Sequence, residues 1–401
     1  MKLRAHADVL AEAVTYTAKA LPSRHPLPVM HGMLLTTGPE GLSLSASDGE
    51  VYTTSTVAAE IADGGQVLIS GRLLNDICGK LPKAGEVDFE LAGARLILSC
   101  GSARFTLPTL PEDEYPTLPD MPEVVASLGA DAFAEAVGQV AVAVGRDDTL
   151  PVLTGIQLRM DGEQLVLAAT DRYRVARREI TVHPSGTLPT AAKKKRRKGA
   201  DDQAVDAAVA EVNTALIPGK TLADAARALD GEHVLRLHWS DGLFGLSVPG
   251  GRSYMTRLLD THEFPKVDAL MGSGRTLTVT MQAVEAVAAV QRVALVAARN
   301  TPVRLFVTDG ELLIEAGSGD DAQALDRIPA DADGEADGTR EDGTYVIAFN
   351  PGYLVDALKS PGTTEVQIEF GHPHKPARIV GRTGEATESY QHVLMPVRID
   401  G

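Results

Sequence analysis

The chain has 401 residues and a formal net charge of −16 at pH 7, from 38 Lys and Arg against 54 Asp and Glu. This excess of acid excludes a uniformly basic nucleic-acid binder, but it allows one basic surface on an acidic protein. Hydrophobic residues make up 44% and aromatic residues only 4%, so the predicted cores are aliphatic. No apolar run is long enough to span a bilayer, and Asp8 and Glu12 interrupt any signal-peptide core.

Cys78 and Cys100 are the only cysteines in the sequence. A disulfide between them is one interpretation, and two free thiols in a reducing cytoplasm is the other. The second is favoured because disulfides are rare in cytosolic proteins. The chain is therefore expected in the cytoplasm.

The first predicted element is an amphipathic helix over Asp8–Leu21, in which Val9, Ala13 and Tyr16 recur at helical spacing. Pro28 then begins a run of short strands separated by Gly-containing turns. Residues 67–81 follow with an apolar strand, a glycine and a second helix. This order predicts an α+β unit in which helices cover one face of an antiparallel sheet.

The same order of elements recurs twice. Pro151–Asp171 has the same residue types at the same spacing as Pro28–Asp48, and a fainter copy starts at Pro302. In the second copy, Ile156, Leu158 and Met160 alternate with polar residues ahead of an Asp-Gly turn. Helices are predicted at Ala130–Val144 and Gln282–Ala298, and strand–helix segments at 215–229 and 345–359. Three copies of one unit predict three domains.

Composition places the domain limits at 1–120, 121–268 and 269–401. Residues 110–124 are rich in proline and suit a linker, and residues 264–275 mark the second boundary.

Two insertions break the repeat. Residues 187–213 contain the basic run KKKRRK at 193–198, and six consecutive cations predict a disordered, solvated segment. Residues 330–343 are acidic and Gly-rich and loosely resemble a calcium loop. Ala336 stands at the required glycine position, so a solvated hairpin loop is predicted instead.

An enzyme is the competing class of function. Asp147, Asp148 and Asp171 are carboxylates of the kind that hold a divalent metal for phosphoryl chemistry. The sequence contains no phosphate-binding loop, dinucleotide fingerprint, nucleophile elbow or zinc-ligand spacing, however. Asp48 and Asp171 are interpreted as turn residues. A non-catalytic protein without cofactor or metal is predicted, with a metal-dependent nuclease as the remote alternative.

Four motifs connect the chain with a known family. They are Thr170-Asp-x-x-Arg174, Glu-Tyr-Pro-Thr-Leu-Pro at 114–119, Pro302-Val-Arg-Leu, and Val-Leu-Met-Pro-Val-Arg at 393–398. Together with the threefold repeat, they make the chain resemble the bacterial replicative sliding clamp, the β subunit of DNA polymerase III. The resemblance covers the chain apart from the two insertions.

The resemblance implies three sliding-clamp domains per chain and a homodimer joined head to tail into a ring around double-stranded DNA. It implies a non-catalytic processivity factor that is opened by a clamp loader and tethers polymerase and repair proteins through short peptide motifs. A second-copy clamp, with an altered pocket that tolerates a clamp-binding inhibitor, is the alternative.

By resemblance, a partner-peptide pocket lies between the second and third domains. Its members would be Leu153, Thr170, Tyr173, Arg174, Val175, Pro265, Leu270, Pro376, Val393, Leu394, Met395, Pro396, Val397 and Arg398. An apolar, Met-containing cleft with an arginine rim suits peptides with leucine or phenylalanine anchors. Arg172 and Tyr173 stand where a Gly and a His are often found, and Ala269 stands where some members carry an Arg. Ordinary core packing is the alternative for Leu153, Val175 and Val393.

The resemblance also implies a DNA-facing surface and a dimer seam. The candidate phosphate contacts, which carry no sequence information, are Arg24, Arg72, Arg146, Lys220 and Arg227. The candidate seam joins Phe105 and Leu107, on an edge strand of the first domain, to Leu295 on the first helix of the third. Pairing that edge across a dimer would remove an aggregation-prone strand.

Overall fold

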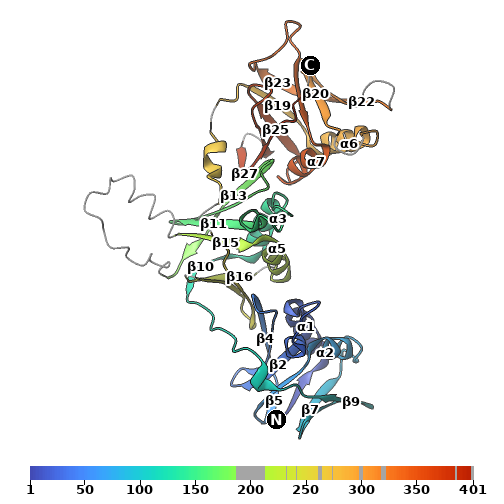
Figure 1. The fold of residues 1–401 in the computed structure, drawn as a ribbon, viewed down its shortest axis with the longest axis vertical. Coiled ribbons are helices and arrows are strands. Elements are labelled where there is room, and N and C mark those ends of the chain that lie inside the picture. The colour runs from blue at the N-terminus through green and yellow to red at the C-terminus, as the bar shows by residue number, and fades with distance from the viewer. Residues whose placement is uncertain are drawn as a thin grey trace, which may run out of the picture. The chain divides into compact units, whose positions relative to one another are not determined.

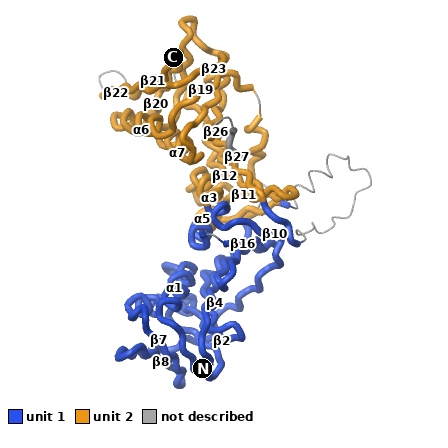
Figure 2. The backbone as a smooth tube through the Cα atoms, turned by 180° about the vertical axis from the view of Figure 1, so that it is seen from behind, with its two compact units in different colours: residues 1–134, 182–213, 224–258 blue, residues 135–181, 214–223, 259–401 orange. Residues whose placement is uncertain are grey.

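The computed structural model describes residues 1–186, 213–231, 233–240, 242–260, 264–272, 274–297, 301–317, 322–383 and 386–398. The basic run at 193–198 lies outside these residues. The chain divides into two compact units (Figure 2), one of residues 1–134, 182–213 and 224–258, the other of residues 135–181, 214–223 and 259–401.

The first unit contains two antiparallel sheets (Figure 1). A five-stranded sheet has the order β5-β1-β7-β8-β9, with bounds Glu60–Asp63, Lys2–His6, Glu86–Ala92, Arg95–Cys100 and Ala103–Pro108. A nine-stranded sheet has the order β14-β10-β16-β17-β18-β4-β3-β2-β6. Its bounds are His183–Pro184, Val124–Gly129, Val234–Trp239, Leu243–Ser247, Arg252–Arg257, Val51–Val57, Gly41–Ser47, Gly32–Gly38 and Gln66–Ser70. Helices α1 (Ala7–Thr17) and α2 (Gly71–Cys78) pack on these strands and on each other.

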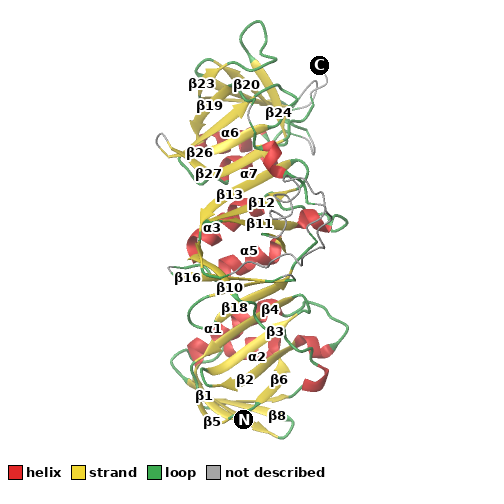
Figure 3. Cartoon of the chain, turned by 90° about the vertical axis from the view of Figure 1, so that its left-hand side faces the viewer, coloured by secondary structure: helices red, strands yellow, loops and turns green. Residues whose placement is uncertain are grey.

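The second unit repeats this arrangement. A nine-stranded sheet has the order β15-β11-β12-β13-β27-β26-β25-β19-β23. Its bounds are Thr214–Pro218, Gly155–Asp161, Gln164–Thr170, Arg174–Thr181, Ala386–Leu394, Ala377–Thr383, Glu365–Phe370, Leu277–Gln282 and Asp331–Gly334. A four-stranded sheet has the order β22-β21-β20-β24, with bounds Ala324–Pro329, Glu311–Ala316, Val303–Thr308 and Tyr345–Phe349. Helices α6 (Ala283–Val293) and α7 (Pro351–Lys359) lie against the strands of this unit (Figure 3).

The predicted α+β repeat is confirmed: each of the three copies contains two helices and antiparallel strands. The division between the units falls within α3 (Ala130–Ala141) and α5 (Gly219–Ala228), the second copies of the two repeated helices. The predicted helix over Asp8–Leu21 ends early, because Ala18–Ala20 form a 3₁₀ turn. The predicted helix over Ala130–Val144 likewise stops at Ala141.

A glycine explains how the first two copies begin. Pro28–His31 and Pro151–Thr154 form 3₁₀ helices, and Gly32 and Gly155 follow them at the start of β2 and β11. A Cβ on Gly155 would lie 2.7 Å from Leu216 side-chain carbons, and one on Gly32 would lie 2.7 Å from Leu68. Any side chain at these positions would force its leucine neighbour to shift. The third copy has no glycine at this place and begins directly with β20.

Two predictions about loops are corrected by the structure. Residues 331–334 form strand β23, which pairs with β19, so they are not a solvated loop. Ala336 is buried in the aliphatic core of the second unit, and this apolar contact holds the segment against the sheet. In the first linker, Tyr115 is buried against Val29, Met30 and Leu68, and Leu110 and Leu118 pack on this cluster, so the linker is held to the first domain as far as Leu118.

Cys78 and Cys100 are both free and buried, as the favoured interpretation predicts. Burial raises the pKa of the Cys78 thiol to about 12, so the thiolate needed for oxidation is scarce at neutral pH.

We expect opposite effects on stability from two Gly→Ala changes. Gly155→Ala forces the buried Leu216 to shift and should lower the free energy of unfolding by about 1–3 kcal/mol, as overpacking does. Gly138→Ala is the control. Gly138 lies inside α3, and a Cβ added there would meet no neighbouring atom within 4 Å, so alanine should raise stability by about 0.5–1 kcal/mol. Urea denaturation of the two variants measures both, and equal signs would contradict the packing account.

Candidate partner-binding site

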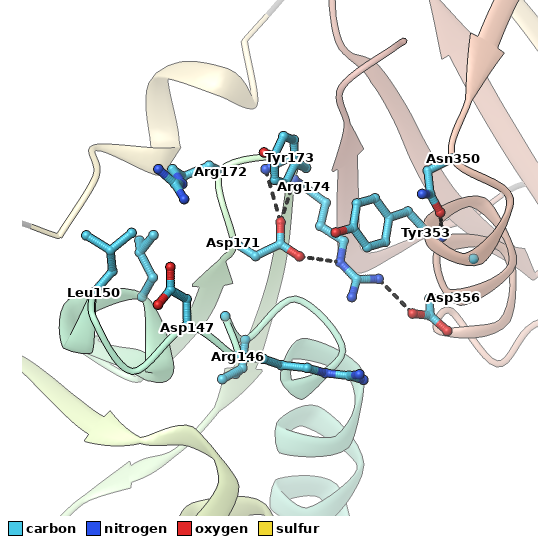
Figure 4. Close-up of a pocket in the computed structure, with 14 residues that line it drawn as sticks. Arg146, Asp147, Leu150, Asp171, Arg172, Tyr173, Arg174, Asn350, Tyr353 and Asp356 are labelled. Atoms are coloured by element: carbon cyan, nitrogen blue, oxygen red, sulfur yellow. Dashed lines mark hydrogen bonds and ion pairs between the residues drawn. The ribbon is translucent and has the colours of Figure 1, made fainter. Parts of the chain in front are cut away.

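A pocket of about 550 Å³ lies in the second unit (Figure 4). The connection from α3 to β11 supplies one wall, the turn between β12 and β13 supplies the middle, and the start of α7 supplies the other wall. The lining residues are Val144, Gly145, Arg146, Asp147, Leu150, Leu153, Asp171, Arg172, Tyr173, Arg174, Asn350, Gly352, Tyr353 and Asp356. Segments far apart in the sequence therefore build one concave site.

Arg174 holds the middle of the pocket to its α7 wall. Its side chain is only 5% exposed, and its Nε donates to Asp171 Oδ2 at 2.9 Å. Its Nη1 donates to Asp356 Oδ2 at 2.7 Å, and the guanidinium carbon lies 4.3 Å from the centre of the Tyr353 ring. A buried guanidinium with two carboxylate partners and an aromatic face is fully engaged. Arg174 is therefore a positioning residue for the pocket walls.

Asp171 organises the turn that carries Arg174. Its Oδ1 accepts hydrogen bonds from the backbone N–H groups of Tyr173 at 3.0 Å and Arg174 at 3.1 Å. The Thr170 hydroxyl donates to the Arg174 carbonyl at 2.8 Å. The interpretation of Asp171 as a turn residue is confirmed, and both of its carboxylate oxygens have partners.

This turn places Arg172 at φ +79°, the one positive φ among the described residues that are not glycine. Left-handed backbone is unfavourable for a residue with a Cβ. The turn also directs Tyr173 outward, where the residue is 55% exposed and its ring stacks on that of Tyr353 with centroids 6.2 Å apart.

The pocket backs onto a buried polar pair on β27. His392 and Tyr390 are fully buried, and His392 Nδ1 is 2.8 Å from the Tyr390 hydroxyl. Burial, and then the charge of Arg174, lower the pKa of His392 to about 3. The imidazole is therefore neutral at physiological pH.

Some of the predicted pocket residues line the pocket, some belong to an apolar cluster, and the others do neither. Leu153, Tyr173 and Arg174 line the pocket. Val175 and Val393 are buried cross-strand neighbours in a small apolar cluster with Phe264 and Val267, and Leu270 packs on its edge. The remaining predicted members are Thr170 and Leu394, which are buried, Met395, Pro396 and Pro376, which are half-buried, and Pro265, Val397 and Arg398, which are exposed.

Backbone hydrogen bonds keep the C-terminal segment beside the pocket. The Met395 N–H donates to the Tyr173 carbonyl at 2.9 Å, and the Val397 N–H donates to the Ala348 carbonyl at 2.8 Å. Met395 therefore follows the same turn that carries Tyr173.

One wall of the pocket is not predicted by the sequence. Asn350, Tyr353 and Asp356 belong to a predicted strand–helix segment, but nothing in the sequence marks them as pocket residues. Arg146, predicted to contact DNA, lines the pocket. Asp147, a candidate metal ligand, accepts hydrogen bonds from the hydroxyl and N–H of Thr149, which lower its pKa. The described part of the chain holds no group of three or more His, Cys, Asp or Glu that could bind a metal.

Two other DNA candidates have intramolecular partners. Arg72 Nη2 donates to the carbonyls of Pro22 and Ser23 at 2.7 and 2.9 Å, and Arg227 pairs with Asp224 at 3.0 Å. Arg24 and Lys220 are exposed, and their side chains form no hydrogen bond or ion pair with another described residue.

The three residues predicted for the dimer seam differ in their exposure. Strand β9 is an edge of the five-stranded sheet, as predicted. Leu107 on β9 is only 1% exposed in the core of the first unit, so its prediction as a surface contact is wrong; side chains alternate between faces, and this one points inward. Phe105 is half-buried, and Leu295 is 85% exposed.

Comparison with known proteins places this architecture in a family. Models of the DNA polymerase III beta subunit match residues 1–119 (N-terminal domain), 127–192 (central domain) and 271–398 (C-terminal domain). A beta sliding clamp of Streptomyces coelicolor is 44% identical over 409 residues, covering all of both chains. A beta sliding clamp homolog, GriR, of Streptomyces muensis is 36% identical and covers 99% of each chain.

Solved structures agree. A sliding clamp from Bacillus subtilis has a TM-score of 0.83 at 25% identity, with complete coverage of both chains. One from Pseudomonas aeruginosa bound to griselimycin has a TM-score of 0.84 at 23% identity, also over the full length of both chains, and supports the fold.

The chain belongs to the DNA polymerase III beta subunit family, the bacterial beta sliding clamps. It is a non-catalytic processivity factor, and the nuclease alternative is wrong. The family forms homodimers that bind DNA, polymerase and other clamp-binding partners. Within the part of the chain that the structure describes, no helix is long and apolar enough to cross a membrane.

Replacing Arg172 by glycine should stabilise the protein. The change removes the cost of a side chain in left-handed backbone, and we expect the free energy of unfolding to rise by about 1 kcal/mol. Arg95→Gly on strand β8 is the matched control, because it makes the same chemical change at an exposed strand position. The control should lose about 0.5–1 kcal/mol. Loss of stability in both variants would show that the turn does not strain Arg172.

Buried neutral His392 should make the protein acid-sensitive. Its pKa is about 3 when folded and near 6.5 when unfolded, so only the unfolded chain gains the proton between these values. This contribution lowers stability as pH falls from about 6.5 towards 3, by up to about 1.4 kcal/mol per pH unit. His392→Asn, which keeps a polar atom near the Tyr390 hydroxyl, should lose this dependence.

The test is urea denaturation of both proteins from neutral pH to pH 5. The stability gap between wild type and variant should shrink as the pH falls below about 6.5. A gap that stays constant with pH would rule out a neutral buried imidazole.

Proposed function

We propose that the Arg174 pocket is the partner-peptide site of this clamp. Leu150 and Leu153 give it an apolar wall, and the stacked Tyr173 and Tyr353 rings give it an aromatic one. Such a concave site, with apolar and aromatic walls beside fixed polar groups, suits a short peptide with leucine or phenylalanine anchors. The predicted residues Met395 and Pro396 extend the site along the C-terminal segment.

We further propose that two copies join head to tail through β9 and β22. The pairing of the repeats carries this proposal. Strands are counted here from the proline that begins each copy, Pro28, Pro151 or Pro302. The third strand of the first repeat, β4, pairs with β18, the last strand of the second repeat. The third strand of the second repeat, β13, pairs with β27, the last strand of the third. The third strand of the third repeat, β22, and the last strand of the first, β9, are both open sheet edges among the described strands.

The same rule therefore assigns β9 of one copy to β22 of another. Two such pairings close a dimer and leave neither edge exposed. Leu295 supports this seam, because it follows α6, and α6 contacts β22 through the ion pair of Arg292 with Asp326 at 2.7 Å. Phe105 on β9 and the exposed Leu295 are the apolar side chains proposed to meet there.

The domain limits 1–120, 121–268 and 269–401 and a cytoplasmic location are part of the same proposal. Among the DNA candidates, Arg24 and Lys220 are kept as phosphate contacts, because both are exposed, have no side-chain partner among the described residues and do not line the pocket. The six described α-helices carry more acidic than basic residues, so loop cations such as Arg24 should supply much of the attraction to phosphate.

The replicative clamp is favoured over a second-copy, inhibitor-tolerant clamp. The chain is 44% identical to the Streptomyces coelicolor beta sliding clamp and 36% identical to the homolog GriR.

A closed ring predicts topological retention. The protein, loaded on nicked circular DNA by its clamp loader, should stay bound at high salt, because a ring around DNA needs no ion pairs. Linearising the circle should release it. Gel filtration and immunoblotting of the DNA fractions measure both, and stripping from intact circles by salt alone would contradict the ring.

Leu295→Asp should abolish retention by placing a carboxylate in the seam, while the unfolding midpoint of the chain changes little. Val284→Asp is the matched control, since Val284 is 79% exposed on the first turn of α6. This control should remain dimeric and retained.

A further inference from the structure

The loop of residues 22–27 lies between α1 and β2, and its own sequence restricts its shape. Pro22 and Pro26 each fix one φ. The Leu27 N–H donates to His25 Nδ1 at 3.2 Å. The loop therefore has less conformational freedom than its irregular backbone suggests.

Both ends of this loop are anchored in apolar packing. Before it, Leu21 packs on the core of the first unit, and a Cβ on Gly71, the first residue of α2, would lie 2.6 Å from Leu21 Cδ1. After it, Val29 and Met30 are buried in a cluster with Tyr115. Because the ends cannot move without disturbing these clusters, only the middle of the loop needs a further hold.

Arg72, the second residue of α2, supplies this hold. Its Nη2 donates to the Pro22 carbonyl at 2.7 Å and to the Ser23 carbonyl at 2.9 Å. Hydrogen bonds from a charged donor are stronger than those between neutral groups. The Arg72 side chain therefore fastens α2 to the backbone of the two residues that precede Arg24.

These bonds prevent Arg72 from binding a phosphate with two donors. A guanidinium binds an oxyanion bidentately through Nε with Nη2 or through Nη1 with Nη2, and both pairs include Nη2. The carbonyls of Pro22 and Ser23 take the two N–H groups of Nη2. Arg24, by contrast, is exposed, and its side chain forms no hydrogen bond or ion pair with another described residue.

The matching position in the second repeat is used differently. Lys220 is the second residue of α5, as Arg72 is of α2. It is exposed and has no side-chain partner within the part of the chain that the structure describes. Lys220 thus carries its charge without fastening a loop, so the two cations are not equivalent despite their shared position.

We infer that Arg72 is a positioning residue for DNA binding, which fixes the loop of residues 22–27 so that Arg24 meets a phosphate in one direction. The inference rests on the proposed function of Arg24 as a phosphate contact. A loop that is already ordered loses less conformational entropy on binding, so Arg24 binds more tightly than it would from a mobile loop.

The test is a double-mutant cycle on DNA binding, with the full-length protein and a short labelled linear duplex. Fluorescence polarisation over a range of salt concentrations gives the slope of log affinity against log salt, to which each phosphate contact adds about 0.9. Arg24→Gln should lower this slope by about 0.9. Arg72→Gln should weaken binding by no more than Arg24→Gln does. The double variant should match Arg24→Gln alone in slope and, to within about twofold, in affinity.

Lys220→Gln is the matched control, because it removes a cation from the same position of another helix. Its effect on the slope should be the same with and without Arg24. Arg72 is exposed, so the unfolding midpoint of Arg72→Gln should change little.

Hydrogen exchange of the free proteins tests the hold on the loop without DNA. The amides of residues 21–30 should exchange faster in Arg72→Gln than in wild type. Arg24→Gln should leave their exchange unchanged, because Arg24 holds nothing in the described structure.

Three results would overturn the inference. If the double variant loses about 1.8 from the slope, Arg72 contacts a phosphate itself. If Arg72→Gln leaves the exchange of the loop unchanged, Arg72 does not hold the loop. If Arg24→Gln keeps the wild-type slope, the proposed phosphate contact fails and the inference fails with it. Only the last result also removes the proposed function of Arg24.

Discussion

The structure depends on one interaction, the antiparallel pairing of β13 with β27. It joins a strand of the second repeat to the last strand of the third, so that strands from both form one nine-stranded sheet. The register sets Val175 opposite Val393 and Arg174 opposite Leu394. The buried valine pair gives the apolar cluster its centre, and the C-terminal segment continues along the turn at Tyr173. Without this pairing, neither the cluster nor the pocket beside it would exist.

Arg174 is a charged residue that is buried at the start of β13, and its partners make this burial possible. Arg174 begins β13 and is covered by the sheet, yet α7 brings Asp356 and the Tyr353 ring within reach of its guanidinium. A buried arginine without partners would be strongly destabilising, whereas here each carboxylate contact also fixes a pocket wall. Arg174 thus joins two walls of the site, whereas the guanidinium groups of Arg146 and Arg172 have no hydrogen-bond or ion-pair partner among the described residues.

The sequence predicts the fold well because the repeat is local. Alternating apolar residues, an Asp-Gly turn and the Pro-Val-x-x-Gly spacing each determine a short segment, and Gly155 shows the packing reason for one of them. The pocket is only partly predictable, because it is built where distant segments meet. Tyr353 and Asp356 have no local signal for a site, and Arg146 has the sequence pattern of a surface cation, although the fold brings it beside the turn. Leu107 shows the same limit, since only the sheet decides which face of β9 is buried.

Each of the first two repeats pairs its third strand with the last strand of the next repeat, and we propose that β22 and β9 extend this rule between copies. Cysteine cross-linking tests it directly, because Cys78 and Cys100 are buried and should not react. A protein with Thr106→Cys on β9 and Leu325→Cys on β22, together with Arg104→Cys and Arg327→Cys versions that cover a shift in register, should form a disulfide-linked dimer on mild oxidation. Variants with a cysteine on one strand alone should stay monomeric on a denaturing gel. A cross-linked dimer from β9 alone, or none from any pair, would contradict the account.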